Sequence, residues 1–578
     1  MRGRDVFIQS LVLHGVRHIF GNPGTTESPL LDALGEVPTL DYVVALHEGI
    51  AVGAASYYAR ASGRTGVVNL HAAPGLGNGI GMLYNALKAN APMVVTAGQQ
   101  DTRMLRRDPI LAHDLVAMAA PVCKWSAQVQ SADEMDEVMR RAFKVANDPP
   151  YGPVFVALPI DVMEQETHNA AIAPGRLHRA PAPDALALTE MAGLIRESST
   201  PVIVVGDEVA RAGAVADLVQ LAERLGAPVW FEGIRGHASF PGSHAQARSN
   251  LPFDGAGIRK ALVGADLVLL LGGAFFEEIW FSAGSPFPEG ARVLQIESSP
   301  QALAHNFAVD VGMVAGMGAA LRSLNGALKS ALDDAWKAAA RARCADLAAQ
   351  KTRDTEAYQS RLAKAWSRTP ISMPRVMAEL RRATPADAVI VEESITASID
   401  MAAAFTYETP DQYLGARGGG IGQGLAGAIG AAVACRGAAV ACGGAAVASR
   451  DAAPAHDAAA ARPVLCVSGD GSAMYSIQAL WTAAHYQLPI VFVILANREY
   501  RVLKHNLDLY RQRFDAASGK AYPHMDLGMP ALGFVELAAG MGVPGVRVSD
   551  PDAIAGAIEQ AFAARAPRLV EIVIEGKR

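Results

Sequence analysis

Cysteine is scarce in this chain of 578 residues, which contains only five. Their number is odd, their spacing is irregular and no two form a Cys-x-x-Cys pair, so neither a disulfide framework nor a zinc site is expected. A reducing compartment, the cytoplasm, is favoured. Blocks of charges of one sign are lacking too. The net charge is −6 without any basic block, which argues against a nucleic-acid partner because such a surface needs a clustered basic face.

Strongly apolar runs long enough to cross a membrane are also missing. The first 15 residues mix charged and apolar side chains and lack the apolar core of a signal peptide. Residues 418–435 carry no charge, but they are mostly Gly and Ala, with little of the Leu, Ile and Phe that drive membrane insertion. We therefore expect a buried Gly/Ala-rich helix there and no membrane partner.

Short apolar runs, by contrast, are frequent and alternate with helical patterns. They include residues 67–70, 93–96, 154–158, 202–205, 267–271, 388–391, 464–467, 490–494 and 569–573. Continuous apolar runs, rather than alternating ones, are typical of buried parallel strands. Strands that alternate with helices predict parallel sheets with covered faces, so the expected fold class is α/β.

Two segments divide the chain into domains. Residues 176–183 are rich in proline and polar residues, as in a linker, and residues 331–367 are charged, Ala-rich and helical in pattern. We predict three doubly wound parallel-sheet domains, with 331–367 as a helical linker: residues 1–175, 185–330 and 368–578. A heptad repeat within residues 431–462 supplies almost no coiled-coil seam, so we interpret it as a low-complexity insertion without a chemical role.

The strongest local signal is the tetrapeptide Gly469-Asp470-Gly471-Ser472, together with Asn497. Both follow predicted strands, and the carboxyl ends of neighbouring parallel strands face one crevice. Asp470 and Asn497 would therefore offer two hard oxygens to one cation, and the free N–H groups that open the next helix would favour a phosphate. For the tetrapeptide alone, an ordinary Asp-Gly turn with a helix cap is the alternative.

Three further clusters follow predicted strands in the first domain: Gly21–Thr25, His47–Gly49 and Asn69–His71. Because the ends of parallel strands converge, we expect Glu48 and His71 to face one site. Glu48 also opens a Gly/Ala-rich helix, where a carboxylate is shielded from water. A helix-capping glutamate and a histidine satisfied in the core are the alternatives for these two residues.

Together these motifs resemble the thiamine-diphosphate-dependent decarboxylase and acetohydroxyacid synthase superfamily, and within it the benzoylformate decarboxylases. The matching segments are GNPGTTESP (21–29), ALHEG (45–49), NLHAAPGLGN (69–78), TAGQQ (96–100), GGGIGQGLAGAIG (418–430) and GDGSAMYSIQALWTAA (469–484). The resemblance covers nearly the whole chain except residues 431–462. It implies pyrimidine-binding, middle and diphosphate-binding domains, in that order. It also implies thiamine diphosphate and Mg²⁺ bound where the subunits of a homodimer or homotetramer meet.

The resemblance assigns roles to individual residues of the cofactor site. It implies that Glu48 hydrogen-bonds the pyrimidine ring, that the Gly419 carbonyl meets its exocyclic amine, and that Ile421 wedges the cofactor into a bent form, for which a stiff β-branched side chain is suited. The implied magnesium ligands are Asp470, Asn497 and the backbone carbonyl of Glu499. Further cofactor contacts are assigned to Ser394, Thr396, Gly469, Gly471, Ser472 and Tyr500.

The residues that would handle the substrate match less completely. His71 corresponds to the histidine that exchanges protons with the reacting molecule, which suits an imidazole, and Thr25 to a serine that contacts the substrate carboxylate. A second active-site histidine is replaced by Ile279, and His113 is the candidate substitute. Pocket-lining positions fall on Leu503 and Asn506. Four aromatic residues could hold an aryl group or belong to the core of the middle domain: Phe275, Phe276, Trp280 and Phe281.

The expected function is a carboxy-lyase that decarboxylates an aryl or bulky 2-oxo acid, without oxidation, to an aldehyde and CO₂. The alternative is a carboligase or lyase that forms or cleaves 2-hydroxy ketones, because slow protonation lets a second carbonyl compound capture the intermediate. A non-catalytic relative is disfavoured by the presence of Glu48 together with Asp470 and Asn497.

Overall fold

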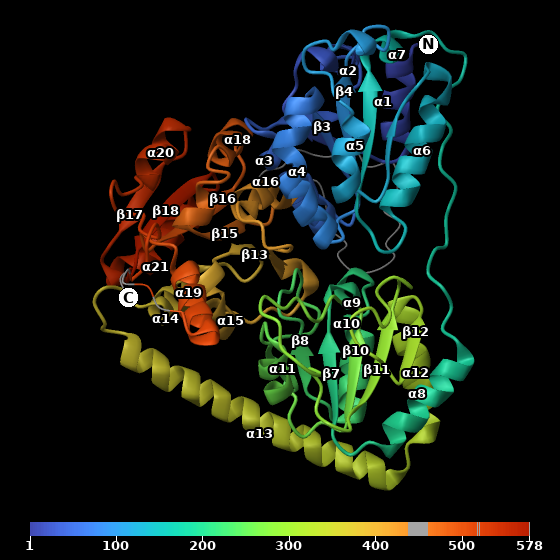
Figure 1. The fold of residues 1–578 in the computed structure, drawn as a ribbon. Helices are drawn as coiled ribbons and strands as arrows, with labels where there is room; N and C mark the ends of the chain where they lie inside the picture. The colour runs from blue at the N-terminus through green and yellow to red at the C-terminus, as the bar shows by residue number, and fades with distance from the viewer. Residues whose placement is uncertain (437–460, 517, 519–520, 577–578) are drawn as a thin grey trace.

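Three parallel β-sheets form the framework of the molecule (Figure 1). The computed structural model describes residues 1–436, 461–516, 518 and 521–576. Each sheet has six strands, and helices flank every sheet. The predicted α/β class, with three parallel sheets, is therefore confirmed.

The first sheet has the strand order β2-β1-β3-β4-β6-β5. Its strands are β1 (His18–Gly21), β2 (Asp41–Val44), β3 (Gly66–Leu70), β4 (Met93–Gln99), β5 (Ser126–Gln128) and β6 (Pro153–Pro159). The helices around it are α1 (Gly3–Leu13), α2 (Ser28–Leu34), α3 (Glu48–Ser62), α4 (Ala72–Lys88), α5 (Leu115–Ala119), α6 (Met135–Ala146) and α7 (Ile160–Glu164). Strands β3, β4 and β6 are buried at every residue, which explains their continuous apolar runs.

The middle sheet has the order β12-β11-β10-β7-β8-β9. Its strands are β7 (Pro201–Val205), β8 (Val229–Phe231), β9 (Ala247–Asn250), β10 (Leu267–Leu271), β11 (Arg292–Glu297) and β12 (Val311–Val314). The helices around it are α8 (Ala185–Glu197), α9 (Asp207–Arg211), α10 (Val215–Leu225), α11 (Gly255–Ala261) and α12 (Met317–Ala331). Here too the two central strands, β7 and β10, are fully buried.

The third sheet has the order β14-β13-β15-β16-β18-β17. Its strands are β13 (Val389–Glu393), β14 (Tyr413–Gly415), β15 (Val464–Gly469), β16 (Ile490–Ala496), β17 (Gly545–Val548) and β18 (Arg568–Val573). The helices around it are α14 (Met373–Ala383), α15 (Ser398–Ala404), α16 (Gln423–Arg436), α17 (Asp470–Ala473), α18 (Ala479–His485), α19 (Arg501–Phe514), α20 (Phe534–Gly540) and α21 (Ile554–Ala563).

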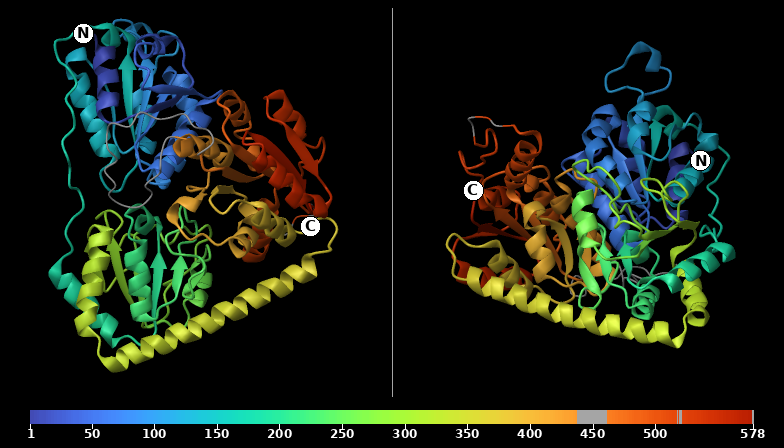
Figure 2. Two further views of the ribbon diagram at one scale, coloured as in Figure 1. Left: turned by 180° about the vertical axis from the view of Figure 1, so that it is seen from behind. Right: turned by 60° about the horizontal axis from the view of Figure 1, so that its bottom comes forward.

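A single long helix leads from the middle sheet to the third. Helix α13 (Asp334–Ala365) has 32 residues, so at 1.5 Å per residue it spans about 48 Å. It runs along the outside of the molecule, as both views of Figure 2 show. Only three of its residues are buried, Ala340, Leu362 and Ala365. The helix therefore bridges two sheets rather than filling a core.

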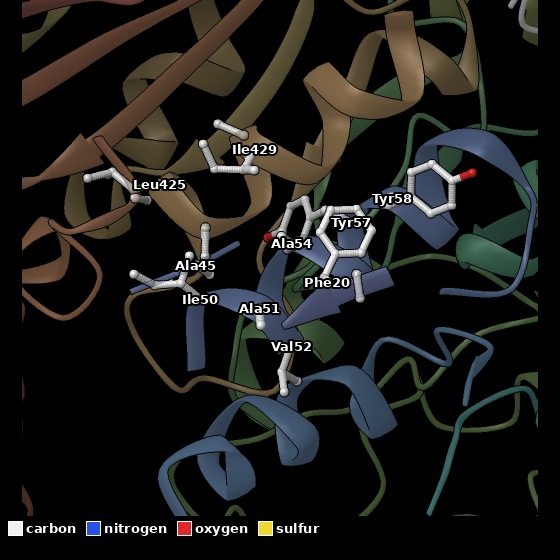
Figure 3. Close-up of a cluster of buried hydrophobic side chains, with 14 of the residues drawn as sticks. Phe20, Ala45, Ile50, Ala51, Val52, Ala54, Tyr57, Tyr58, Leu425 and Ile429 are labelled. Atoms are coloured by element: carbon white, nitrogen blue, oxygen red, sulfur yellow. The ribbon is translucent and has the colours of Figure 1, made fainter. Parts of the chain in front are cut away.

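The first and third sheets are joined by close packing of helix α3 against helix α16. Every residue of α16 from Gln423 to Cys435 is buried, which confirms the expected buried Gly/Ala-rich helix. A Cβ atom at Gly430 would lie 1.9 Å from the Ala54 carbonyl oxygen, and one at Gly427 would lie 2.6 Å from the Tyr57 ring. Figure 3 shows side chains of both helices in one cluster, with Leu425 and Ile429 on one side and the α3 residues on the other.

No helix among the described residues is long and apolar enough to cross a membrane. The four described cysteines, Cys123, Cys344, Cys435 and Cys466, are free. The predicted insertion at 431–462 lies outside the described residues except for 431–436, which end helix α16, and 461–462.

The glycine contact between α3 and α16 predicts that Gly430→Ala destabilises the protein. Its new methyl group would overlap the Ala54 carbonyl, so we expect the free energy of unfolding to fall by about 1–3 kcal/mol, as in other overpacked cores. Urea unfolding measures the change. Gly556→Ala in α21 is the control, because a Cβ there meets no atom within 4 Å. Equal stability of the two variants would contradict the packing argument.

Candidate active site

The acidic and amide oxygens predicted to hold a cation lie side by side at the third sheet. Strand order reverses between β13 and β15, and α/β sheets bind ligands at such a switch point. Asp470 follows β15 directly, and Asn497 follows the neighbouring strand β16, which is paired with β15 through Gly469 and Leu495. The structure therefore brings these two predicted ligands to one edge.

Backbone N–H groups hold the two oxygen donors in place. The Asp470 carboxylate accepts hydrogen bonds from the Arg498 N–H at 2.6 Å and the Gly471 N–H at 2.8 Å. The Asn497 side-chain oxygen accepts one from the Glu499 N–H at 3.0 Å. Burial raises the pKa of Asp470, although these N–H groups act in the opposite direction. A bound cation would offset the cost of burying this charge.

The side chain of Glu499 points into an ion-pair network. Its carboxylate is buried and pairs with Arg501 at 3.0 Å and with Lys504. The Glu499 carbonyl accepts a hydrogen bond from the Arg501 N–H at 3.0 Å, which leaves a second lone pair on that oxygen. The network thus occupies the carboxylate, and the carbonyl is the oxygen of Glu499 that could serve a metal.

The remaining predicted cofactor residues surround this edge. Helix α17 after Gly469 has only four residues, and Ser472 is buried in it. The Tyr500 ring lies so close to Gly471 that a Cβ there would be 2.6 Å from it. Ser394 and Thr396 follow strand β13 at the switch point, and the Ser394 hydroxyl donates to Glu392.

Glu48 lies at the start of helix α3 and is held by two asparagine side chains. Asn22 donates to its carboxylate at 3.1 Å and Asn78 at 3.0 Å. Glu48 itself is buried, and the helix is capped by the His47 side chain, which accepts from the Gly49 N–H. Asn22 thus joins the first cluster to Glu48, and a Cβ at Gly24 would lie 2.2 Å from the His71 ring, so the three clusters converge. His47 is the N-cap residue, so the capping interpretation of Glu48 is wrong.

His71 contacts a buried carboxylate, Glu27, that the sequence did not predict as part of the site. Its Nδ1 lies 2.8 Å from Glu27 and 3.2 Å from the Thr26 hydroxyl. Glu27 is buried and also accepts from the Gly24 N–H, the Gly98 N–H and the Thr26 hydroxyl. With Nδ1 turned toward this carboxylate, Nε2 is the ring nitrogen left for chemistry. The signal was present: Glu27 belongs to the GNPGTTESP motif beside a strand end.

Thr25 and His113 do not share this network. Thr25 is exposed, and its neighbour Thr26 provides the hydroxyl near His71. His113 is exposed as well, while its backbone carbonyl accepts from Gln99 at the end of strand β4. The segment that carries His113 therefore borders the carboxyl edge of the first sheet through its backbone.

Gly419 and Ile421 lie in a loop with left-handed backbone angles. Gly418 and Gly419 each have φ +81°, and Gly422 has φ +97°, which side-chain-bearing residues rarely adopt. Gly420 exchanges two hydrogen bonds of 3.1 Å with the side chain of Asn85 on helix α4. A Cβ at Gly419 or at Gly469 would meet no atom within 4 Å, so the backbone at both glycines is open on that side to a bound group.

The aromatic residues of the middle domain divide into two pairs. Phe275 and Phe276 belong to the core of that domain, where Phe276 meets Phe287 and Phe307 edge to face. Trp280 is half-buried and Phe281 is 77% exposed. Arg513, near the end of helix α19, donates to the Phe281 carbonyl. Leu503 and Asn506 lie earlier on the same helix. Ile279 is 61% exposed.

Within the described residues of one chain, no hydrogen bond or ion pair joins the Glu48 group to Asp470 or Asn497. Likewise, no group of three or more His, Cys, Asp or Glu side chains suited to a metal lies in the described part of the chain. The donors present are one carboxylate, one amide oxygen and one carbonyl, a hard-oxygen set that fits magnesium.

Comparison with known proteins gives consistent matches along the chain. Three models of thiamine pyrophosphate enzyme domains match: the N-terminal TPP binding domain over residues 1–118, the central domain over 188–324 and the C-terminal TPP binding domain over 396–572. Benzoylformate decarboxylase of Pseudomonas aeruginosa is 32% identical over 97% of this chain and 96% of its own. The acetolactate synthase isozyme 3 large subunit of Escherichia coli is 26% identical over 100% and 95%. The solved structure of a Rhodococcus jostii thiamine diphosphate-dependent 4-hydroxybenzoylformate decarboxylase has a TM-score of 0.82, at 29% identity over 100% of both chains.

The hydrogen bonds of Glu27 predict that Glu27→Gln weakens the fold. The carboxylate accepts from four donors, whereas the amide nitrogen of glutamine cannot accept, so at least one buried donor loses its partner. We expect a loss of about 1–3 kcal/mol in the free energy of unfolding, measured by chemical denaturation. Glu137→Gln on the exposed face of helix α6 is the control. A Glu27→Gln protein as stable as that control would refute the network.

Proposed function

The chain belongs to the thiamine pyrophosphate enzyme family, and from this premise we propose that it decarboxylates an aryl or bulky 2-oxo acid to an aldehyde and CO₂. The observation that carries the proposal is the pairing of His71 with buried Glu27, beside Glu48 at one sheet edge. A proton-exchanging group thus lies next to a carboxylate suited to an aminopyrimidine. The 32% sequence identity to benzoylformate decarboxylase of Pseudomonas aeruginosa, over 97% of this chain, supports the same reaction.

The described residues fit thiamine diphosphate and magnesium at two half-sites. Asp470, Asn497 and the Glu499 carbonyl would hold the metal, and the open backbone of Gly469 would lie beside the diphosphate. On the other half-site, Glu48 would hold the pyrimidine ring. When bound, the cofactor supplies the electron sink that makes loss of CO₂ from a 2-oxo acid possible. The further contacts assigned to Ser394, Thr396, Gly471, Ser472 and Tyr500 belong to the diphosphate half.

The two half-sites would be completed by a second subunit. Within the described residues of one chain, no hydrogen bond or ion pair joins Glu48 to Asp470. Exposed apolar side chains lie close to both residues in sequence. Leu46 is 47% exposed two residues before Glu48, and Tyr475 is 60% exposed just after α17. Such side chains beside a polar site are typical of protein interfaces. We therefore propose a homodimer or homotetramer with active sites at the subunit interface.

His71 would move the proton at the carbon atom that loses CO₂. Its Nδ1 is committed to Glu27, so Nε2 would face the substrate. Thr25 and Thr26 would supply hydroxyl groups to the substrate carboxylate, and Leu503 would border its side chain. His113 remains our candidate for a second proton donor, on a segment that borders the same sheet edge.

Carboligation is the second candidate function. One observation favours it: the position of a second active-site histidine is occupied by Ile279, which cannot donate a proton. A relative that is named as an acetolactate synthase large subunit also matches the chain. A reacting molecule that waits longer for its proton has more time to meet a second carbonyl compound.

A panel of 2-oxo acids separates the two reactions. With thiamine diphosphate and Mg²⁺, we expect kcat/KM for CO₂ release to be at least about tenfold higher for benzoylformate than for pyruvate, since pocket shape commonly discriminates by that factor. The aldehyde and any 2-hydroxy ketone are quantified in the same reactions, with Glu48→Gln as the inactive control. Predominant ligation of pyruvate would reject decarboxylation as the main activity.

Mixed oligomers test whether the site is shared. Glu48→Gln and Asp470→Asn subunits should each be inactive alone. A purified mixed dimer should regain about half of the wild-type activity, because one of its two shared sites keeps both residues. Activity is measured on dimers isolated with two different tags. Inactive mixed dimers with bound cofactor would place Glu48 and Asp470 in one chain's own site instead.

A further inference from the structure

The carboxyl edge of the middle sheet has the form of a ligand site but is lined by acidic residues. Strand order in this sheet reverses between β7 and β10, where α/β sheets bind ligands. Asp207 follows β7, Glu232 follows β8, and Glu277 lies in the loop after β10. Backbone atoms close the crevice itself, because a Cβ at Gly206 would lie 2.3 Å from the Gly273 Cα atom. These carboxylates would also repel a nucleotide phosphate.

A cation from the third domain fills this edge. The guanidinium group of Arg417 lies 3.3 Å from Glu232, 3.5 Å from Glu277 and 4.0 Å from Asp207. Its side chain is only 4% exposed. Burial works to raise the pKa of Asp207, but neighbouring cations, Arg417 foremost, hold it below its ordinary value. Arg417 thus occupies the place that a bound ligand would take.

A second arginine, from the first domain, hydrogen-bonds to residues beside this edge of the middle sheet. Arg60 of helix α3 donates to the Gly236 carbonyl at 2.7 Å and to the Gly415 carbonyl at 2.9 Å. Gly236 in turn donates its N–H to Asp207 at 2.8 Å. Elements of all three domains therefore meet around Arg417.

Arg417 directly precedes the glycine loop that carries Gly419 and Ile421. Gln423, after the loop, donates to the Gly420 carbonyl at 2.6 Å and to the Arg417 carbonyl at 2.8 Å, so it joins the two ends of the loop. The N-terminus of α16 donates to Glu393 and fixes the far end. Glycines are conformationally free, so a loop built from them depends on such anchors. Asn85 holds Gly420 in its middle, and the ion pairs of Arg417 hold its start.

We propose that Arg417 is a positioning residue of the active site. The middle domain uses its ligand-binding edge to hold this arginine, and thereby fixes Gly419 and Ile421 where the cofactor's pyrimidine would lie. The inference rests on the proposed function for the role of Gly419 and Ile421, but the anchoring of the loop by Arg417 is independent of the substrate.

Two measurements on the full-length protein test the proposal. The first is hydrogen exchange of the peptide 413–425 in the protein without cofactor. The second is the apparent Kd for thiamine diphosphate in the presence of Mg²⁺, followed by quenching of tryptophan fluorescence. The variants are Arg417→Met, which keeps the apolar stem, and Arg417→Lys, which keeps the charge but not the fork. Arg375→Met is the matched control, because Arg375 is a buried, ion-paired arginine of the same domain on helix α14.

We expect Arg417→Met to speed exchange in 413–425 and to weaken cofactor binding by about tenfold or more, as for loss of one partner of a buried charge pair. Arg417→Lys should recover part of both effects. Arg375→Met should lower the melting temperature while leaving the exchange of this peptide and the Kd within about twofold of wild type.

The proposal would be overturned if Arg417→Met showed the same hydrogen exchange in 413–425 and the same Kd for thiamine diphosphate as the Arg375→Met control. If Arg417→Met does not fold, the same comparison is made with Arg417→Lys, and wild-type behaviour there would overturn it equally. If the wild-type protein fails to bind thiamine diphosphate, the proposed function falls, whereas exchange in 413–425 still decides whether Arg417 anchors the loop.

Discussion

The contact between helices α3 and α16 is the constraint on which the candidate site depends. The two helices approach closely enough that a methyl group at Gly430 would overlap the Ala54 backbone. Glu48 begins the first helix, and the loop with Gly419 and Ile421 leads into the second. The distance between the first and third sheets, and with it the placement of both half-sites, is therefore set by small residues that let two backbones touch.

The same topological feature recurs in all three sheets and is used differently in each. At the switch point of the first sheet, the segments after β1 and β3 bring Glu27 against His71. In the third sheet, the corresponding position holds Asp470. In the middle sheet it receives Arg417 from the same chain. Strand ends present unpaired backbone N–H groups and polar side chains, which suit them either to a ligand or to an internal substitute for one.

Several carboxylates of the site are buried, and each accepts hydrogen bonds from nearby donors. Glu48 has two asparagine amides, Glu27 has backbone N–H groups with a hydroxyl and an imidazole, and Asp470 has backbone N–H groups. Glu393, which accepts from the start of α16, still has its pKa raised to about 7 by burial. Because a buried charge without partners is costly, these donors offset part of that cost and fix the position of each oxygen.

The sequence alone determined the α/β class, the succession of three parallel sheets and the convergence of strand-end motifs, because buried parallel strands leave continuous apolar runs and their carboxyl ends must share an edge. It also identified the buried Gly/Ala-rich helix, because a segment without charges and with few Leu, Ile and Phe suits a protein core better than a membrane. Only the tertiary structure decided which partners complete the site. The Glu27–His71 pair, the asparagines on Glu48 and the ion pairs of Arg417 join residues that are 26 to 210 positions apart. Such contacts depend on how helices and loops pack across sheets, and no local periodicity encodes that packing.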